Sequence, residues 1–519
     1  MRRLAALLLA AVLSLCLGSC TQGEGEPSAS LVPEPSPSQQ IQALPFALAY
    51  DPTASLHPIT SQSQVNLDLA GLVYEGLYEL DQSFTPQPAL ARSAAVSADG
   101  LTWTITLDSG ARFSDGTPLT AQHAADSLNA ARASALYAAR LSAISQVAAA
   151  EDGRLVVTLS SPNGALDALL DIPIVLEQEG AAPLGTGRYR FVREGEELYL
   201  SANEHHGDTL PYDTIPLREV TGAEERIAAF DSGEVTAVVT DFSASYALGY
   251  AGNYESCDFP TSTLLYVGFR TDGGVCASPQ VRRAFSRAFD REELVDALMA
   301  GHGDPACLPV SPLHGEYDRE AASALKYDPE EAGELLSQAG YGLEEDGVRR
   351  RGGNALQVTI AVNNDSAFKQ SLAEYLADCL ETLGVTVSVE AMPWESYQSA
   401  LTAGRFDLYI GEVRMTGDFD PGELLAGGLN YGGYAGQGVG QLLTAWRGAR
   451  GAAREQVAGQ LWQAFAQDVP LAPLCFKRGS LLLRWGTASG VQPTQADPFW
   501  NMEDWQITGA SPSAPGGEV

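Results

Sequence analysis

The chain has 519 residues. At roughly 100–200 residues per domain, a chain of this length is expected to form two to four domains. Apolar residues make up 45% and charged residues 18% of the chain, which is typical of a folded globular protein. The formal net charge of −34 argues against a nucleic-acid-binding protein, because such proteins normally present a basic face.

The common nucleotide-binding and catalytic motifs are absent from the sequence. None of the three lysines, Lys326, Lys369 and Lys477, is followed by Ser or Thr, so there is no Walker A loop. The sequence also lacks HExxH, CxxC, GxSxG and GxGxxG motifs, and its six histidines form no visible cluster with cysteines. We therefore expect no catalytic residues, no cofactor and no protein metal site.

The N-terminus has the pattern of a secretory signal. Arg2 and Arg3 precede an apolar run over 4–17, which has signal-peptide length and is too short for a comfortable membrane-spanning helix. The run ends in Leu-Gly-Ser-Cys, which resembles a bacterial lipobox with Cys20 as the lipidated residue. The alternative is an ordinary signal peptide that happens to contain a cysteine.

We therefore predict a lipoprotein signal peptide over 1–19, with Cys20 as the new N-terminus. The next segment, 20–40, is rich in Ser, Pro, Glu and Gln, which predicts a flexible linker because it has little apolar surface to bury. A disordered tail is expected over 511–519.

Five further cysteines remain in the mature chain, so at least one thiol stays free. Cys276 lies just before an expected helix and Cys307 lies shortly after it. An oxidising compartment permits a disulfide between them, with two separate thiols as the alternative.

Between about 77 and 184 the sequence predicts a mainly antiparallel region. Apolar residues alternate with polar ones over 101–107, and a second strand is expected over 155–159. Turn signals such as Asp115-Gly116 separate these elements.

A different pattern begins near Leu264. A strand is expected over 264–269, followed by a helix that Ser278 caps and that Gly301 ends. Further on, strands over 356–362 and 385–389 flank a helix over 368–383. This strand–helix–strand order predicts parallel pairing and an α/β fold.

Several blocks in this order resemble the family 5 extracytoplasmic solute-binding proteins, the oligopeptide, dipeptide and nickel receptors of ABC importers. The resemblance covers about 45–505 and rests on these blocks: 56–58, 74–77, 98–107, 112–121, 185–189, 281–284, 289–291 and 405–408. Two features depart from the family pattern. Arg188 stands where a proline is usual, and 412–421 lacks the usual Trp although it keeps Asp-Phe-Asp-Pro.

The resemblance implies an α/β, two-lobed periplasmic-binding-protein-like fold of the cluster C type, with an extra domain inserted in the first lobe. Lobe I is expected to comprise 41–76, 185–265 and 480–510, the inserted domain 77–184, and lobe II 266–479. Two lobes joined by two crossings can close on a solute by hinge bending.

The resemblance also suggests residues that contact the solute. An aspartate in the stretch that holds Asp418 pairs with the α-ammonium group of peptide ligands in this family; the alternative is that Asp418 only caps a helix. Arg414 is a candidate for a ligand carboxylate, or it pairs with Glu412, which we also place at the site. Ser61, Gln62 and Ser63 form a loop that offers backbone groups to an extended peptide, or a plain polar turn. Trp394 either lines the cleft or belongs to the core.

These observations together predict a non-catalytic, lipid-anchored receptor. It would capture a solute, which we expect to be a peptide, in the inter-lobe cleft and deliver it to an ABC permease with ATPase subunits. The alternatives are an extracytoplasmic hydrolase on the same fold, or a receptor for a sugar or a nickel chelate. We expect a monomer that contacts the membrane through the lipid on Cys20 and binds no nucleic acid. It would lie at the outer face of the bacterial cytoplasmic membrane or in the periplasm.

Overall fold

The computed structural model describes residues 46–242 and 249–507. The predicted signal peptide, Cys20, the predicted linker and the predicted C-terminal tail lie outside the described residues. Within the described part of the chain, no helix is long and apolar enough to cross a membrane.

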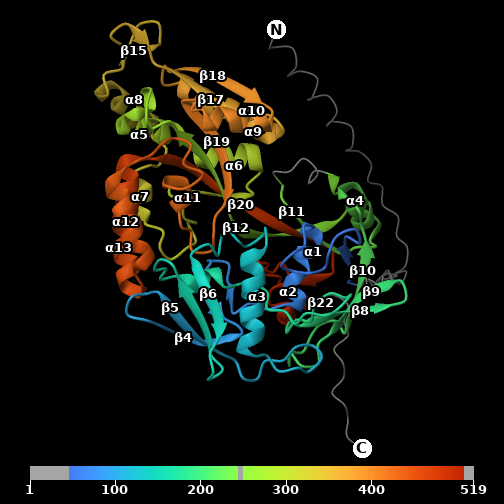
Figure 1. Cartoon of the computed structure of the whole chain (residues 1–519). Helices are drawn as coiled ribbons and strands as arrows, with labels where there is room; N and C mark the ends of the chain where they lie inside the picture. Colours follow the sequence, from blue (N-terminus) through green and yellow to red (C-terminus); the bar gives the residue numbers. More distant parts are fainter. Residues whose placement is uncertain (1–45, 243–248, 508–519) are drawn as a thin grey trace, which may run out of the picture. The chain divides into compact units, whose positions relative to one another are not determined.

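The largest sheet combines antiparallel and parallel pairing (Figure 1). It contains seven strands, six of which follow the order β11-β20-β12-β19-β17-β18 while β13 pairs with β20. Their bounds are Ala237–Thr240 (β11), Tyr254–Phe269 (β12), Gly303–Pro305 (β13), Gln357–Asn363 (β17), Thr386–Met392 (β18), Leu408–Arg414 (β19) and Leu471–Arg484 (β20). β12 and β20 are the long members, and they pair antiparallel along most of their length.

The predicted α/β crossover is confirmed. β17 and β18 pair in parallel, and α9 (Ala367–Glu381) connects them. The Ser366 side chain accepts a hydrogen bond from the Lys369 backbone N–H and so caps this helix. Leu372, Leu376 and Leu380 are fully or almost fully buried, as the apolar spacing predicts.

The prediction of a single helix between Ser278 and Gly301 is wrong. The chain forms α5 (Pro279–Ala288) and α6 (Arg291–Met299), with a break at Phe289 and Asp290. The Asp290 side chain accepts hydrogen bonds from the backbone N–H groups of Glu292 and Glu293, so it starts a new helix. Ser278 precedes α5, but its side chain makes no capping hydrogen bond.

The predicted antiparallel region is also confirmed. β4 (Ala91–Val96), β5 (Thr102–Leu107), β7 (Leu155–Leu159) and β6 (Ile144–Ala149) form one sheet in that order. All of its pairs are antiparallel. A second four-stranded sheet has the order β1-β10-β9-β8, with bounds Leu48–Tyr50 (β1), Thr214–Glu219 (β10), Glu197–Ala202 (β9) and Tyr189–Glu194 (β8).

The remaining strands form small ribbons: Tyr78–Leu80 (β2) with Pro86–Pro88 (β3), Gly342–Leu343 (β14) with Arg349–Arg351 (β15) and Asn354–Ala355 (β16), and Ala488–Ser489 (β21) with Gln506–Ile507 (β22). The other α-helices are Gln64–Asp68 (α1), Ala70–Val73 (α2), Ala121–Ala133 (α3), Ala223–Ser232 (α4), Arg319–Ser323 (α7), Pro329–Gln338 (α8), Trp394–Thr402 (α10), Gly422–Leu425 (α11), Gln437–Gly448 (α12) and Gly451–Asp468 (α13).

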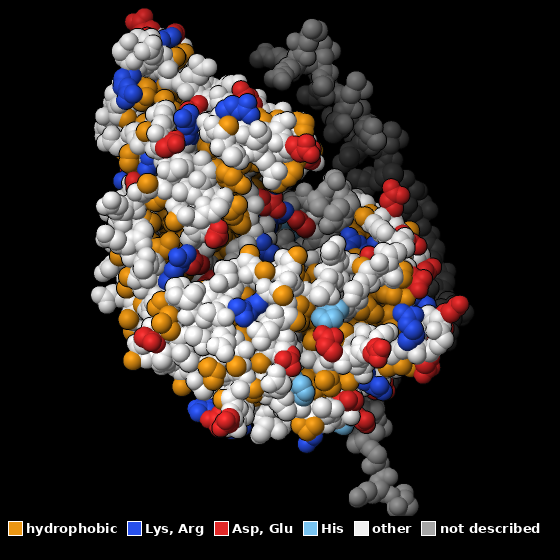
Figure 2. All heavy atoms as spheres, in the orientation of Figure 1, with side chains coloured by type: hydrophobic (Ala, Val, Ile, Leu, Met, Phe, Trp, Pro, Cys, Tyr) orange, Lys and Arg blue, Asp and Glu red, His pale blue; other side chains and the backbone are white. Residues whose placement is uncertain are grey.

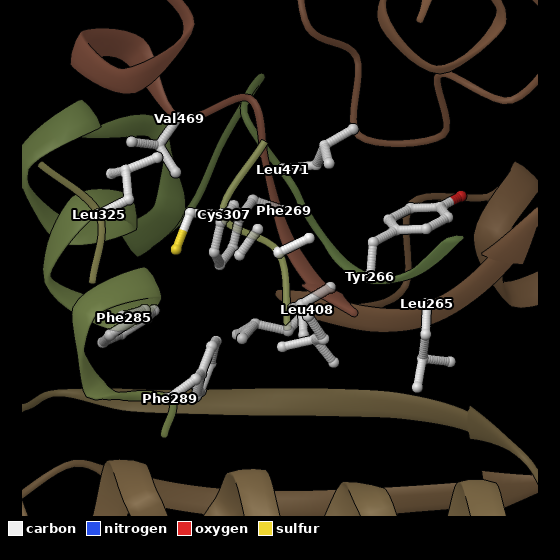
Figure 3. Packing of buried hydrophobic residues seen from close by; sticks show 14 of the residues in the cluster. Leu265, Tyr266, Phe269, Phe285, Phe289, Cys307, Leu325, Leu408, Val469 and Leu471 are labelled. Atoms are coloured by element: carbon white, nitrogen blue, oxygen red, sulfur yellow. The ribbon is translucent and has the colours of Figure 1, made fainter. Parts of the chain in front are cut away.

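The two lobes have separate hydrophobic cores. The core of lobe II draws almost all of its buried residues from 264–476, and Figure 3 shows Phe269, Phe285 and Phe289 packed in it. The core of lobe I joins residues of 46–217 with residues near the C-terminus, so the inserted domain shares its apolar cluster with lobe I. The predicted domain boundaries themselves stay a prediction.

β12 and β20 connect the two cores. On β20, Phe476 belongs to the core of lobe II whereas Leu481 belongs to that of lobe I. On β12 the pairing register shifts between Pro260 and Leu264. A bulge of this kind bends a strand and interrupts its ladder, so it marks the crossing between the lobes.

Arg188, one of the two departures from the family pattern, is buried in lobe I. Its guanidinium forms an ion pair with Asp497 and donates to Glu503 Oε2 at 3.2 Å and to the Gly71 carbonyl at 3.2 Å. A Cβ atom on Gly71 would collide with the Asp497 side chain, so glycine is required there. Arg188 thus fixes the C-terminal segment to lobe I.

The predicted disulfide between Cys276 and Cys307 is not formed. Both residues are buried as free thiols in the core of lobe II. Burial raises the pKa of the Cys276 thiol, which keeps it in the unreactive protonated form.

Candidate functional site: the cleft between the lobes

The candidate site lies at one edge of the large sheet. β17 pairs in parallel with both β18 and β19, so the carboxyl ends of these three strands point the same way. Ligands of open α/β sheets bind outside the carboxyl ends of the strands. Figure 2 shows a hollow on this face of the molecule in which acidic and basic side chains gather.

Glu412, near the end of β19, is neutralised by two lysines. Its carboxylate lies 2.9 Å from Lys369 Nζ and 3.3 Å from Lys477 Nζ. Burial alone would raise the pKa of Glu412, but the two ammonium groups outweigh burial and lower it. Glu412 is therefore ionised and already paired, and its predicted contact with a solute stays a prediction.

Arg414, two residues further along β19, is in the opposite situation. It does not pair with Glu412, and within the described part of the chain its side chain makes no hydrogen bond or ion pair. Burial lowers the pKa of its guanidinium, while Tyr137 and Asp68, both of lobe I, favour the charged form. A partly desolvated guanidinium without a partner has its hydrogen-bond donors free for a ligand oxygen.

Asp68 faces this arginine from lobe I. It is the last residue of α1 and accepts a hydrogen bond from Gln64 Nε2 at 2.8 Å. Burial raises the pKa of its carboxyl to about 6, against weaker opposing effects of Gln64, Arg226 and Arg414. The two walls of the cleft therefore face each other with an acid on lobe I and an arginine on lobe II.

Asp418 is buried and already hydrogen-bonded. It is 4% exposed, and it accepts from Thr416 Oγ1 at 2.6 Å and from Asn163 Nδ2 at 3.1 Å. Burial and the nearby Asp420 raise the pKa of its carboxyl. Asn163 belongs to the inserted domain, so Asp418 joins lobe II to the first lobe.

Asp418 does not cap the following helix; the Asp420 side chain accepts from the Gly422 N–H instead. The alternative reading of Asp418 as a cap is thus wrong. To take the ammonium group of a ligand, Asp418 would have to share or release its bond to Asn163. Its role in binding stays a prediction.

The predicted loop leads directly into the cleft wall. Ser61 is buried and accepts from the Ser63 N–H at 3.3 Å, Gln62 is exposed, and Ser63 immediately precedes α1. The loop thus sets the position of α1 and of Asp68 at its end. Trp394 begins α10 just after the carboxyl end of β18. Its side chain is 50% exposed, so it is not a core residue.

Sequence patterns missed several residues of the cleft. Asp68 ends a short helix and Tyr137 lies in a run of turns, and no local signal distinguishes either residue. The rarity of lysine was a usable signal. The chain has only three lysines, and two of them, Lys369 and Lys477, pair with Glu412. Among the residues that the structure describes, no group of three potential ligands could hold a metal ion.

Comparison with known proteins identifies the family of this chain. Residues 85–435 match the model of the bacterial extracellular solute-binding proteins, family 5. The oligopeptide-binding protein AppA of Bacillus subtilis is 22% identical, over 96% of this chain and 97% of its own length. The glutathione-binding protein GsiB of Escherichia coli K12 is 26% identical over 65% of this chain and 67% of its own.

Solved structures show the same fold. The crystal structure of a nickel ABC transporter protein from Bacillus halodurans superposes with a TM-score of 0.73, covers 88% of this chain and 98% of its own, and is 19% identical. The chain therefore belongs to family 5 of the extracellular solute-binding proteins of ABC importers, a family of two-lobed binding proteins and not of enzymes.

Proposed function

We propose that this protein is a lipid-anchored extracytoplasmic receptor that captures a peptide between its lobes and delivers it to an ABC permease. The free guanidinium of Arg414 carries this proposal. A peptide has a terminal carboxylate, and an arginine binds a carboxylate with two parallel hydrogen bonds. Relatives that bind oligopeptides or glutathione favour the same ligand class.

Binding would select the closed form of the protein. A solute that contacts Arg414 on lobe II and the wall of Asp68 and Tyr137 on lobe I has more contacts when the lobes are together. It would therefore shift the population toward the closed form, which the permease would recognise. We expect the receptor to work as a monomer.

Calorimetry with tri-alanine and its C-terminal amide tests the ligand class. The two peptides differ only in the carboxylate. Tri-alanine should bind, and the amide should bind about tenfold more weakly or worse, because a hydrogen bond between charged groups contributes roughly 1.5–3 kcal/mol. Glucose and a Ni²⁺–histidine chelate serve as comparisons; binding of either one alone would replace the peptide proposal.

The membrane anchor has its own test. Replacing Cys20 with Ala should leave the protein without an acyl chain and release it from membranes, because the lipid is the proposed attachment. Mass spectrometry of the mature N-terminus and membrane fractionation measure this. A mature chain that starts at another residue, without acyl mass on Cys20, would contradict the lipobox.

A further inference from the structure

The crossing between the lobes contains a buried lysine with carboxylates on both sides. Lys477 lies on β20 between Phe476 of one core and Leu481 of the other. Opposite it, β12 has the register shift between Pro260 and Leu264. Thr261 Oγ1 in this bulge donates to the Lys477 carbonyl at 2.7 Å. Lys477 therefore sits where a change in the angle between the lobes is expected to act.

The two acids that hold Lys477 come from different lobes. Asp241 directly follows β11, a strand whose Ala237 belongs to the core of lobe I, and its carboxylate lies 2.6 Å from Lys477 Nζ. Glu412 is on β19, whose Leu408 and Ile410 belong to the core of lobe II, and it lies 3.3 Å from the same nitrogen. One ammonium group thus bridges the two lobes.

The bridge is shielded at its lysine and more open at its acids. The Lys477 side chain is only 9% exposed, whereas the side chains of Asp241 and Glu412 are 38% and 26% exposed. Burial would lower its pKa, but Glu412 and Asp241 outweigh burial and raise it, so the ammonium group stays charged. Shielded ion pairs are screened less by salt than surface pairs, and breaking one by removing a partner is costly.

We infer that Lys477 is a positioning residue that restrains the lobes from opening before a solute arrives. It would do so without contact with the solute, through its simultaneous pairing with Asp241 and Glu412. Opening at the bulge would move these acids apart, and Lys477 would lose one of them. Glu412 would keep Lys369, which also lies on lobe II. The inference rests on the proposed function and deepens it. If the binding-competent arrangement of the lobes is already populated without ligand, less of the binding free energy is spent on closing them, and the apparent affinity is higher.

Small-angle X-ray scattering of the full mature protein without ligand tests the inference. Lys477→Met should have a larger radius of gyration than the wild type. Lys326→Met is the matched control, because Lys326 is an exposed lysine of lobe II and should leave the radius unchanged. A Lys477→Met protein that is folded and as compact as the wild type would overturn the inference.

A second variant separates the bridge from a general loss of stability. Asp241→Asn removes the lobe I half of the bridge and leaves Lys477 paired with Glu412. It should expand the ligand-free protein in the same direction as Lys477→Met. A compact Asp241→Asn protein beside an expanded Lys477→Met protein would rule out the bridge as the cause.

Binding kinetics give the functional readout. With tri-alanine as the probe, Lys477→Met should dissociate about tenfold faster while its association rate changes little, since affinity differences lie mostly in dissociation. An unchanged dissociation rate would overturn the coupling to capture. If the wild type does not bind tri-alanine, the proposed ligand class fails, while the scattering comparison still decides whether the bridge restrains the lobes from opening.

Discussion

Arg188, which is buried in lobe I, and Arg414, which is solvent-accessible in the cleft, show two uses of an arginine. Arg188 is surrounded by Asp497, Glu503 and a backbone carbonyl. Burial would lower its pKa, but the acids raise it. Arg414 has no such partners within the described residues, and burial lowers its pKa.

The difference between the two arginines distinguishes a residue that stabilises the fold from a residue that is available to a ligand. A buried charge that is fully paired holds segments together, and removing it leaves its partner unpaired. An accessible arginine without a protein partner keeps its hydrogen-bond donors free for a ligand, and removing it leaves no protein group unpaired. Stability and ligand affinity should therefore respond in opposite ways at the two arginines.

The largest expected effect is on stability at Arg188. Arg188→Met should destabilise the protein by about 3 kcal/mol, because Asp497 would remain buried without its cation. Thermal unfolding of the variant beside Arg190→Met, an exposed neighbour, measures this. Equal melting temperatures for the two variants would show that Arg188 is not a structural anchor.

The reverse pattern is expected at Arg414. Arg414→Gln should weaken tri-alanine binding by about 2 kcal/mol or more, with no loss of melting temperature, because no protein group is left unpaired. Arg405→Gln is the control, since Arg405 is exposed in the turn before β19. Calorimetry decides the outcome, and unchanged affinity would remove Arg414 from the binding site.

Asp418 lies between these extremes, because it is buried, paired and close to the cleft. Asp418→Asn should weaken binding of tri-alanine by about 2 kcal/mol if the carboxylate takes the ligand ammonium group. N-acetyl-tri-alanine lacks that charge, so its affinity should change much less. An equal loss for both peptides would assign Asp418 to the lobe contact through Asn163 and not to the ligand.

The smallest expected effect is the pH dependence of Asp68. Its folded pKa of about 6 is above the ordinary value of 3.8, so the folded state binds more protons in this range and stability falls as the pH rises from about 4 to 6. Asp68→Asn should therefore stabilise the protein at pH 8 and flatten this dependence. The gain should be about 1 kcal/mol, less than the full shift of the pKa implies, because the side chain is partly exposed.

Urea unfolding at pH 4.5 and pH 8 measures the effect of Asp68. Asp126→Asn is a matched control, because Asp126 also accepts from a glutamine four residues earlier, at 2.8 Å, but lies on an exposed helix face. The same pH response in both variants would show that burial in the cleft does not perturb Asp68.

The sequence by itself determined the local elements and the family. The period-two apolar pattern predicted β5, and the 3.6-residue pattern with its flanking strands predicted α9 and the parallel pairing of β17 with β18. These features depend on neighbours within a few residues, which is why they can be read locally. The motif blocks likewise predicted the two-lobed fold and the absence of catalysis.

The tertiary structure alone decided which charges meet. The sequence around Arg414 does not show that its side chain lacks a partner among the described residues. Glu412 lies two residues away on the same strand and was a possible partner, but the two side chains do not pair. Glu412 instead pairs with Lys369 and Lys477, which are 43 and 65 residues away in the chain. Electrostatic pairing depends on distance in space and on burial, and both arise only when β12, β19 and β20 bring remote segments together.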